Sequence, residues 1–272
     1  MGAIDARRLQ DLLAGERFVS RVLVLKSTRS TNDDALRLAA EGAPEGTVVI
    51  ADSQAAGRGR LGRGWHSPPG AGLYLSVLFR PAAPVEDWTR WTIASSLAIC
   101  DGCRSASGCD VLIKWPNDLL LSGRKVAGIL AEAKTAHGLS QALVVGIGIN
   151  ANHEANDFPP EIRERAISLR IGRGGASVDR ESVASCCLGE LARVSAALAQ
   201  GDWNAVRDAW ARRAPGAHGR RVRVKPEGAD GARAAFEGTT RGLDRTGALL
   251  VEREQGDVRA VHAAESVVFL EA

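Results

Sequence analysis

Four glycines and three arginines lie within the twelve residues Gln54–Trp65 of this chain. Glycine lets backbone N–H groups approach a ligand closely, and the arginine guanidinium matches the oxygens of phosphate and carboxylate groups. No acidic residue stands between Asp52 and Glu86. This segment, called here the glycine–arginine loop, therefore predicts a site for an anion. Its like charges should repel one another when no anion is bound.

Two known phosphate-binding motifs resemble the loop in part. The order Gly57-x-Gly59-x-x-Gly62 satisfies the dinucleotide fingerprint, but that fingerprint works where a strand leads into a helix. Prolines and a strand pattern follow here instead, so we do not expect a Rossmann domain. The phosphate loop of ATPases ends in Gly-Lys-Ser/Thr, which the segment lacks. A mobile, solvated loop is the plain alternative, although it does not require three spaced arginines beside a tryptophan.

Further polar groups stand at the ends of predicted elements. Ser30, Thr31 and Asn32 precede a helical pattern, where hydroxyls either cap the helix or bind a polar ligand group together with the helix amides. The turn Lys114–Asp118 follows a strand, and Lys125 follows the next turn. None of these sets pairs a covalent nucleophile with a base. They suit in-line attack on a nucleoside triphosphate, a reaction that enzymes accelerate by positioning the reactants and stabilising the charge of the transition state.

The chain has 272 residues, of which 45% are apolar, and a net charge of +3. This length and composition are typical of a globular protein. The sequence contains no run of 18 uncharged apolar residues and no signal-peptide core, so we expect a cytoplasmic protein with no membrane span. Five cysteines include Cys100-x-x-Cys103, but a zinc site would need a fourth ligand at suitable spacing. We interpret the cysteines as small packing residues and expect no metal site of the protein's own.

The hydrophobic pattern predicts an α+β fold. Short turns join many of the successive strands, which indicates a mixed or largely antiparallel sheet. Asp179 and Asp202 should each begin an amphipathic helix. After these helices come about 55 residues with several short strand candidates. The expected domains are therefore 1–215, which carries the site, and 216–272, a small β-barrel. The strands expected in the first domain are Arg21–Lys26, Thr47–Ala51, Leu73–Phe79, Asp110–Trp115, Leu119–Leu121, Arg124–Glu132 and Ala142–Asn150.

Five motifs occur in order across residues 20–150 and together resemble the biotin–protein ligases. They are Ser30-Thr31-Asn32, Gln54-x-x-Gly57-Arg58-Gly59-Arg60-x-Gly62-Arg63-x-Trp65, Lys114-Trp115-Pro116-Asn117-Asp118, Arg124-Lys125-x-Ala127-Gly128-Ile129-Leu130 and Gly146-Ile147-Gly148-Ile149-Asn150. The resemblance implies a catalytic domain similar to those of class II aminoacyl-tRNA synthetases, followed by an SH3-like barrel. It also implies a reaction with ATP, accompanied by Mg²⁺, that forms biotinyl-5′-AMP and then biotinylates one lysine of a biotin carboxyl carrier protein domain.

The resemblance also implies roles for individual residues. The catalytic set is Lys125, Arg58, Arg60 and Asp118. Biotin should meet Ser30, Thr31, Asn32, Gln54, Arg58, Gly59, Arg60 and Lys125. The nucleotide should meet Arg58, Arg60, Arg63, Trp65, Asn117, Asp118 and Asn150. Asp118 is expected either to accept the proton of the acceptor amine or only to position a substrate.

Members of this family that repress transcription carry an N-terminal DNA-binding domain. The first twenty residues leave no room for a helix-turn-helix module, so we expect an enzyme that does not bind DNA. Two alternatives are a lipoate–protein ligase, which shares the adenylation logic, and a nucleic-acid-binding protein that uses its arginines on phosphates.

Overall fold

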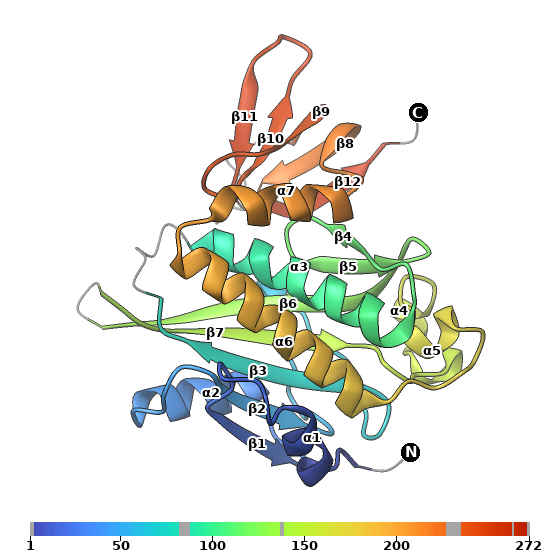
Figure 1. Ribbon diagram of the computed structural model, residues 1–272. Coiled ribbons are helices and arrows are strands. Elements are labelled where there is room, and N and C mark those ends of the chain that lie inside the picture. Colours follow the sequence, from blue (N-terminus) through green and yellow to red (C-terminus); the bar gives the residue numbers. More distant parts are fainter. Residues whose placement is uncertain (1–2, 82–87, 137–138, 227–234, 263, 271–272) are drawn as a thin grey trace.

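The computed structural model describes residues 3–81, 88–136, 139–226, 235–262 and 264–270. Within these ranges a seven-stranded sheet has the order β1-β2-β3-β7-β6-β5-β4 (Figure 1). β1 and β2 are parallel, and the other neighbouring strands are antiparallel. The predicted mixed sheet is therefore confirmed. Its strands are β1 (Arg21–Leu25), β2 (Thr47–Ala51), β3 (Leu73–Phe79), β4 (Leu112–Lys114), β5 (Asp118–Leu121), β6 (Arg124–Ala136) and β7 (Leu139–Ile149).

The two faces of this sheet are covered differently. Alternate residues of β3 point to opposite faces. Leu75 and Val77 belong to a large core with α3 (Trp88–Ser107) and α6 (Arg180–Ala199), which lie across that face (Figure 1). Leu78 belongs to a smaller core with α2 (Thr31–Ala40) on the other face. Because α2 covers only part of that second face, the rest of it is available for a site.

The long helices begin where the sequence predicted. Asp179 is the N-cap of α6, and the carboxylate of Asp202 accepts a hydrogen bond from the N–H of Ala205 at the start of α7 (Trp203–Arg213). α6 is long and apolar enough to cross a membrane by length and composition alone. However, one of its faces packs in the core against α3, as expected for a core helix of a globular domain. The shorter helices are α1 (Ala6–Leu12), α4 (Pro160–Arg163) and α5 (Leu169–Gly172).

The C-terminal region forms a separate antiparallel sheet with the order β11-β10-β9-β8-β12. It packs on the central domain: Trp115 donates its indole N–H to the carbonyl of Gly247 (3.3 Å), and Arg90 donates to the carbonyl of Arg245 (2.8 Å). The final strand of the chain was not predicted. The strands are β8 (His218–Pro226), β9 (Phe236–Leu243), β10 (Leu249–Glu252), β11 (Val258–Val261) and β12 (Ala264–Phe269).

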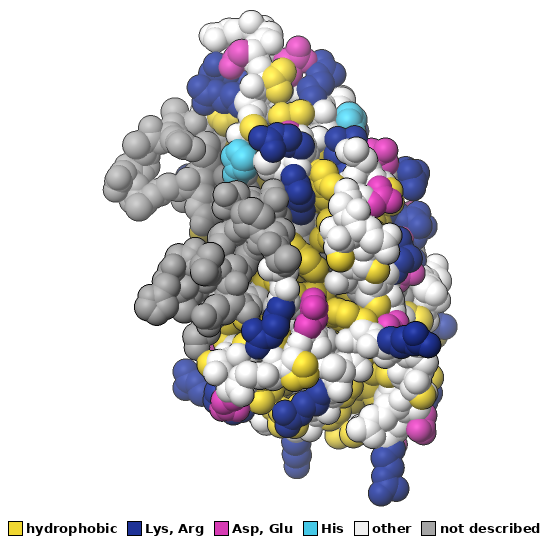
Figure 2. Space-filling view, turned by 60° about the vertical axis from the view of Figure 1, so that its left-hand side comes forward, with side chains coloured by type: hydrophobic (Ala, Val, Ile, Leu, Met, Phe, Trp, Pro, Cys, Tyr) yellow, Lys and Arg dark blue, Asp and Glu magenta, His cyan; other side chains and the backbone are white. Residues whose placement is uncertain are grey.

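Basic and acidic side chains are interleaved on this second sheet, at the top of the molecule (Figure 2). Arg223 pairs with Glu237 (2.6 Å), Arg253 pairs with Asp257 (2.6 Å), and Arg241 contacts Glu252. A surface that binds nucleic acid without sequence preference instead presents clustered positive charge. The mixed charge of this sheet does not favour the nucleic-acid-binding alternative.

The cysteines behave as packing residues, as predicted. All five are free, and four of them are buried. Burial raises the pKa of the Cys100 thiol to about 12, so this group is a poor nucleophile and a poor metal ligand. Among the described residues, no three His, Cys, Asp or Glu side chains are grouped so that they could hold a metal ion.

Candidate active site

A cavity of about 590 Å³ opens on the face of the central sheet that carries α2. It is bounded by the start of α2, the glycine–arginine loop, the β5–β6 hairpin and the middle of β7. Every residue that the sequence predicted for the site lines this one cavity. These residues are Ser30, Thr31, Asn32, Gln54, Arg58, Gly59, Arg60, Arg63, Trp65, Asn117, Asp118, Lys125 and Asn150.

Glycines on β6 and β7 make room for two of these side chains. A Cβ atom on Gly146 would lie 2.1 Å from Oδ1 of Asn32, and one on Gly148 would lie 2.4 Å from Cε2 of Trp65. A Cβ atom on Gly128 would lie 3.0 Å from the same indole. Strand glycines often mark a close approach of another group, and the structure identifies Asn32 and Trp65 as the groups that approach here.

The start of α2 is tied to the first residue of the glycine–arginine loop. The backbone N–H of Thr31 donates to Oε1 of Gln54 (2.9 Å), and the Thr31 hydroxyl donates to the same oxygen (3.2 Å). Nε2 of Gln54 in turn donates to the hydroxyl of Ser67 (3.1 Å). Ser30 occupies the N-cap position of α2 but makes no side-chain capping bond. Ser30 lines the cavity, and its hydroxyl does not cap the helix.

Asn32 is held by both ends of its amide group. Its Oδ1 accepts a hydrogen bond from the hydroxyl of Ser76 on β3 (2.5 Å). Its Nδ2 donates to a carboxylate oxygen of Glu132 (2.6 Å) and to the carbonyl of Leu130 (3.4 Å). Sequence reasoning missed Ser76 and Glu132. The signal for Ser76 was a single serine among the aliphatic and aromatic residues of Leu73–Phe79.

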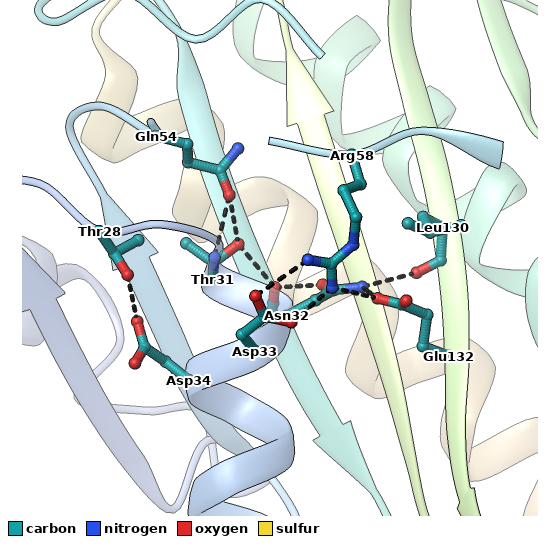
Figure 3. Close-up of polar contacts among 10 residues, drawn as sticks. Thr28, Thr31, Asn32, Asp33, Asp34, Gln54, Arg58, Leu130 and Glu132 are labelled. Atoms are coloured by element: carbon teal, nitrogen blue, oxygen red, sulfur yellow. Dashed lines mark hydrogen bonds and ion pairs between the residues drawn. The ribbon is translucent and has the colours of Figure 1, made fainter. Parts of the chain in front are cut away.

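Arg58 has partners that the sequence did not predict. Its guanidinium donates two hydrogen bonds to the carboxylate of Asp33 (2.9 and 2.5 Å) and lies 3.4 Å from Glu132 (Figure 3). The hydrogen bond to Asp33 is the main cause of the raised pKa of Arg58. The bond to Arg58 in turn lowers the pKa of Asp33. The glycine–arginine loop contains no acid of its own, but these neighbouring elements supply two.

The glycine–arginine loop folds into a compact hairpin. Arg58 and Gly64 form an antiparallel bridge, and the N–H of Gly59 donates to the carbonyl of Arg63 (2.7 Å). Leu61 and Gly62 turn the chain with φ angles of 59° and 69°. No α-helix begins here, since the described chain continues to the strand β3. The loop is therefore not a dinucleotide-binding motif.

Lys125 and Asp118 face one another across the β5–β6 hairpin. Nζ of Lys125 lies 2.5 Å from Oδ1 of Asp118 and 5.3 Å from the centre of the Trp65 ring, within the range of a cation–π contact. The tight turn at Ser122 and Gly123, with φ angles of 49° and 74°, brings the two strands together. Lys125 is thus a positioned cation at the cavity wall.

Two asparagines of the predicted site differ in how much of their amide groups is engaged. Nδ2 of Asn117 donates to the carbonyl of Ile129 (2.8 Å), while its Oδ1 lies 3.5 Å from the Arg60 guanidinium. Asn150 donates to the carbonyl of Ile167 (3.1 Å) and to that of Lys125 (3.3 Å). Asn150 therefore holds backbone segments together beneath Lys125, in addition to lining the cavity.

The structure adds walls that the sequence did not predict. Val267 and Val268, on β12, line the cavity together with Phe158. His153 stacks on Phe158 with ring centres 5.0 Å apart. His153 is fully buried, and within the described part of the chain neither ring nitrogen has a hydrogen-bond partner. Burial lowers the pKa of His153 to about 4, so this side chain is a neutral support for the wall.

The arrangement provides hydrogen-bonding groups at one end of the cavity and cations at the other. Asn32 lies beside Gly146 of β7, whereas Trp65 and Lys125 lie beside the paired glycines Gly148 and Gly128, two residues further along the strand. The indole N–H of Trp65 is buried and has no partner among the described residues, so an acceptor on a bound ligand could satisfy it. Such a cavity can hold a neutral polar ring at one end and stabilise negative charge on a phosphate or carboxylate at the other.

Comparisons with known proteins agree with this description. The sequence model of the Biotin/lipoate A/B protein ligase family matches residues 24–150. The chain is 35% identical to the bifunctional ligase/repressor BirA of Bacillus subtilis over 242 residues, which are 89% of this chain and 71% of that protein. It is 34% identical to the biotin–[acetyl-CoA-carboxylase] ligase of Paracoccus denitrificans over 256 residues, which are 90% of this chain and 99% of that protein.

A similar fold occurs in a solved structure, the biotin protein ligase from Aquifex aeolicus in complex with biotin and ATP. The TM-score is 0.78 at 28% sequence identity, and the match covers 92% of this chain and 100% of that chain.

Proposed function

The chain belongs to the biotin–protein ligase family, and we propose that it activates biotin with ATP and transfers it to a lysine of a biotin carboxyl carrier protein domain. In the first step a carboxylate oxygen of biotin attacks the α-phosphorus of ATP, which forms biotinyl-5′-AMP and releases pyrophosphate. In the second step the lysine amine attacks the acyl carbon and AMP leaves. Its partners are therefore biotin, ATP and the carrier domain of a biotin-dependent carboxylase, and we place it in the cytoplasm.

The observation that carries this proposal is the convergence of all five sequence motifs on one cavity. The first and last motifs are separated by more than a hundred residues along the chain, yet the residues of all five motifs surround a single space. In-line attack on a nucleoside triphosphate needs the two reactants held in one geometry and the developing charge stabilised. A cavity with hydrogen-bonding groups at one end and cations at the other meets both needs.

Within this proposal, Lys125 and Arg60 act on the reacting oxygens. The Lys125 ammonium is compact and is already ordered by Asp118, so little reorganisation accompanies its interaction with a phosphate or carboxylate oxygen. Asp118 orders Lys125, and in this proposal it either accepts a proton from the attacking amine in the second step or only positions a substrate. Trp65 and Asn117 border the nucleotide, while Ser30, Thr31 and Asn32 meet the ring of biotin.

Mg²⁺ enters this reaction with ATP. It usually binds through one or two carboxylates and the substrate phosphates, and it keeps several waters. Asp118 and Glu164 are the carboxylates among the described residues that line the cavity, so they are the side chains on which such a cation could rest. Its contribution would be to neutralise charge on the phosphates.

We further propose that residues 1–215 form the catalytic domain and that residues 216–272 form a small domain that completes the site. The position of Val267 and Val268 on the cavity wall supports this division of roles. A domain of this size has little core of its own, and the contacts of Trp115 and Arg90 with its backbone provide a docking surface.

Exchange of labelled pyrophosphate into ATP tests the proposal directly. We expect exchange that depends on biotin and is absent when lipoate replaces it or when neither is added. Incubation with a carrier domain should then add one biotin to that domain, as measured by mass spectrometry. Exchange that depends on lipoate, or no exchange with either acid, would contradict the proposed substrate.

A further inference from the structure

Two carboxylates from different elements meet at the guanidinium of Arg58 (Figure 3). Asp33 lies in the first turn of α2 and binds Arg58 through both of its oxygens. Glu132 lies on β6, and its carboxylate lies 3.4 Å from Nη2 of Arg58, a nitrogen that also donates to Asp33. A bidentate pair fixes the plane of the guanidinium as well as its position. Arg58 therefore joins the loop to a helix and to a strand at once.

The charge of this cluster argues against a phosphate as the partner of Arg58. The Arg58 guanidinium already faces two carboxylates, of which Asp33 binds it through both oxygens. An approaching phosphate would have to displace Asp33 and would then meet two like charges. Arg58 was expected among the groups that contact the adenylate, but its surroundings suit a different task.

We propose that Arg58 is a positioning residue, which Asp33 and Glu132 hold so that it closes the glycine–arginine loop over the biotin end of the cavity. This inference rests on the proposed function, because it assigns the Asn32 end to biotin. The catalytic cations of the loop and hairpin are then Arg60 and Lys125, whereas Arg58 acts through the geometry of the loop.

A continuous ring of polar contacts supports this role. Glu132 binds Arg58 and also the amide of Asn32, and Asn32 reaches Thr31 through the hydroxyl of Ser76. Thr31 binds Gln54, which begins the loop. The segment Gln54–Arg58 is thus anchored at both ends on the same helix turn. Loss of the Arg58 anchor should free one end of the loop and loosen the groups around the biotin ring.

The KM for biotin distinguishes a role of Arg58 in positioning the loop from a role in binding a phosphate. If Arg58 positions the loop, Asp33→Asn weakens the bidentate pair and raises the KM for biotin. If Arg58 binds a phosphate, Asp33→Asn removes a competitor, so activity stays the same or rises. Asp34→Asn is a matched control, because it removes the same charge from the same turn of α2. Asp34 lies outside the ring: its carboxylate accepts from the Thr28 hydroxyl (2.6 Å).

The experiment measures biotin-dependent pyrophosphate exchange for the full-length wild type, Asp33→Asn, Asp34→Asn, Arg58→Ala and the double variant of Asp33→Asn with Arg58→Ala. We expect Asp33→Asn to raise the KM for biotin about tenfold with kcat within about twofold, the pattern of lost binding that is equal in ground and transition states. Asp34→Asn should match the wild type. The double variant should be no worse than Arg58→Ala, because residues that act through one another are not additive.

A second measurement does not depend on activity. Trypsin cuts after arginine, and the loop contains three, so the rate of cleavage within Gly57–Gly64 reports how well the loop is held. This rate should rise several-fold in Asp33→Asn but not in Asp34→Asn, while the thermal midpoint of unfolding stays the same in both. If the wild type shows no exchange, the proposed function fails, and the cleavage rates still test the anchor.

Two results would overturn the inference. One is a wild-type KM for biotin together with a wild-type cleavage rate in Asp33→Asn. The other is an Arg58→Ala variant that lowers kcat while the KM for biotin is unchanged, which would identify Arg58 as a group that acts on the reacting oxygens.

Discussion

Substitution of Gly146 by alanine should impair the biotin end of the cavity while leaving the nucleotide end intact. The new Cβ atom would lie 2.1 Å from Oδ1 of Asn32, whereas ordinary contacts are 3.4–4 Å. The amide of Asn32 must therefore move by about 1 Å or more. Its short hydrogen bonds to Ser76 and Glu132, at 2.5 and 2.6 Å, cannot both survive such a shift.

The size of the effect follows from these bonds. A neutral hydrogen bond contributes about 1 kcal/mol net, and one to a charged group contributes about 1.5–3 kcal/mol. Replacing a strand glycine recovers about 0.5–1 kcal/mol of backbone entropy. We therefore expect Gly146→Ala to lower the free energy of unfolding by about 1–3 kcal/mol. With Asn32 displaced, the KM for biotin should rise about tenfold or more, since tenfold corresponds to about 1.4 kcal/mol.

Gly148→Ala on the same strand provides the comparison. Its Cβ would lie 2.4 Å from Trp65, whose indole N–H has no hydrogen bond to lose among the described residues. It should raise the KM for ATP at a smaller cost in stability. Gly189→Ala in α6 is the control for the substitution itself, because the nearest atom lies 3.9 Å from the added Cβ. The assay is pyrophosphate exchange with each substrate varied in turn, beside urea unfolding. Equal increases of both KM values in both strand variants would refute the assignment of the two ends.

Other predictions follow from the same geometry. Lys125→Ala should reduce the rate of adenylate formation by the equivalent of about 2–4 kcal/mol in transition-state stabilisation, with folding nearly unchanged; a folded variant with the wild-type rate would exclude Lys125 from catalysis. Val268→Asp should lower exchange activity, because this half-exposed side chain lines the cavity, whereas Val258→Asp on the same sheet changes an equally exposed valine away from it; equal activity of the two variants would count against a role for the small domain. The pKa of His153 is about 4 when folded and 6.5 in its ordinary state. The unfolded chain therefore binds a proton below pH 6.5 that the folded chain does not, and stability should fall by about 3 kcal/mol between pH 6.5 and pH 4. His153→Leu should lack this component of the pH dependence in urea unfolding, and an unchanged pH profile would show that the ring is not held neutral.

The sequence predicted the elements of the sheet well because each strand is marked by its own residues. Thr47–Ala51 and Leu73–Phe79 are strands with the predicted bounds, since both are apolar runs that end at glycine or polar residues. The final strand, Ala264–Phe269, was missed. It follows β11 almost directly in the chain but pairs with β8, a long-range contact that no local pattern reveals.

The sequence motifs identified residues that line one cavity, but they did not identify the partners of these residues. The motifs named the residues that line the cavity, because each motif is a local run of unusual composition. The partners of Arg58 are distant: Asp33 lies 25 residues away and Glu132 lies 74 residues away. The predicted repulsion within the empty loop considered only charges of the loop itself. The acids that balance the charge of Arg58 are near it only in the folded protein, so the sequence alone could not identify them.

The distribution of charge gives the cavity a direction. Around Asn32, the Arg58 guanidinium faces two carboxylates, Arg29 also acts on one of these carboxylates, and the groups that bind Asn32 itself include a hydroxyl and a carboxylate. At Asp118, by contrast, one carboxylate pairs with Lys125, the neighbouring Asn117 contacts Arg60, and the exposed Arg63 also lines the cavity. A triphosphate placed at the first end would meet like charge, whereas at the second end it would meet cations that are already in position. A neutral ring with N–H and carbonyl groups has the opposite preference, because hydrogen-bonding groups serve it better than bare charge. We therefore propose that the two substrates lie in one order along the cavity, biotin near Asn32 and ATP near Lys125, with the carboxylate of biotin towards the phosphates of ATP. The contacts of Asp33 and Glu132 with Arg58 keep this gradient in place, because they remove one arginine from the cations that would otherwise attract phosphate to the biotin end.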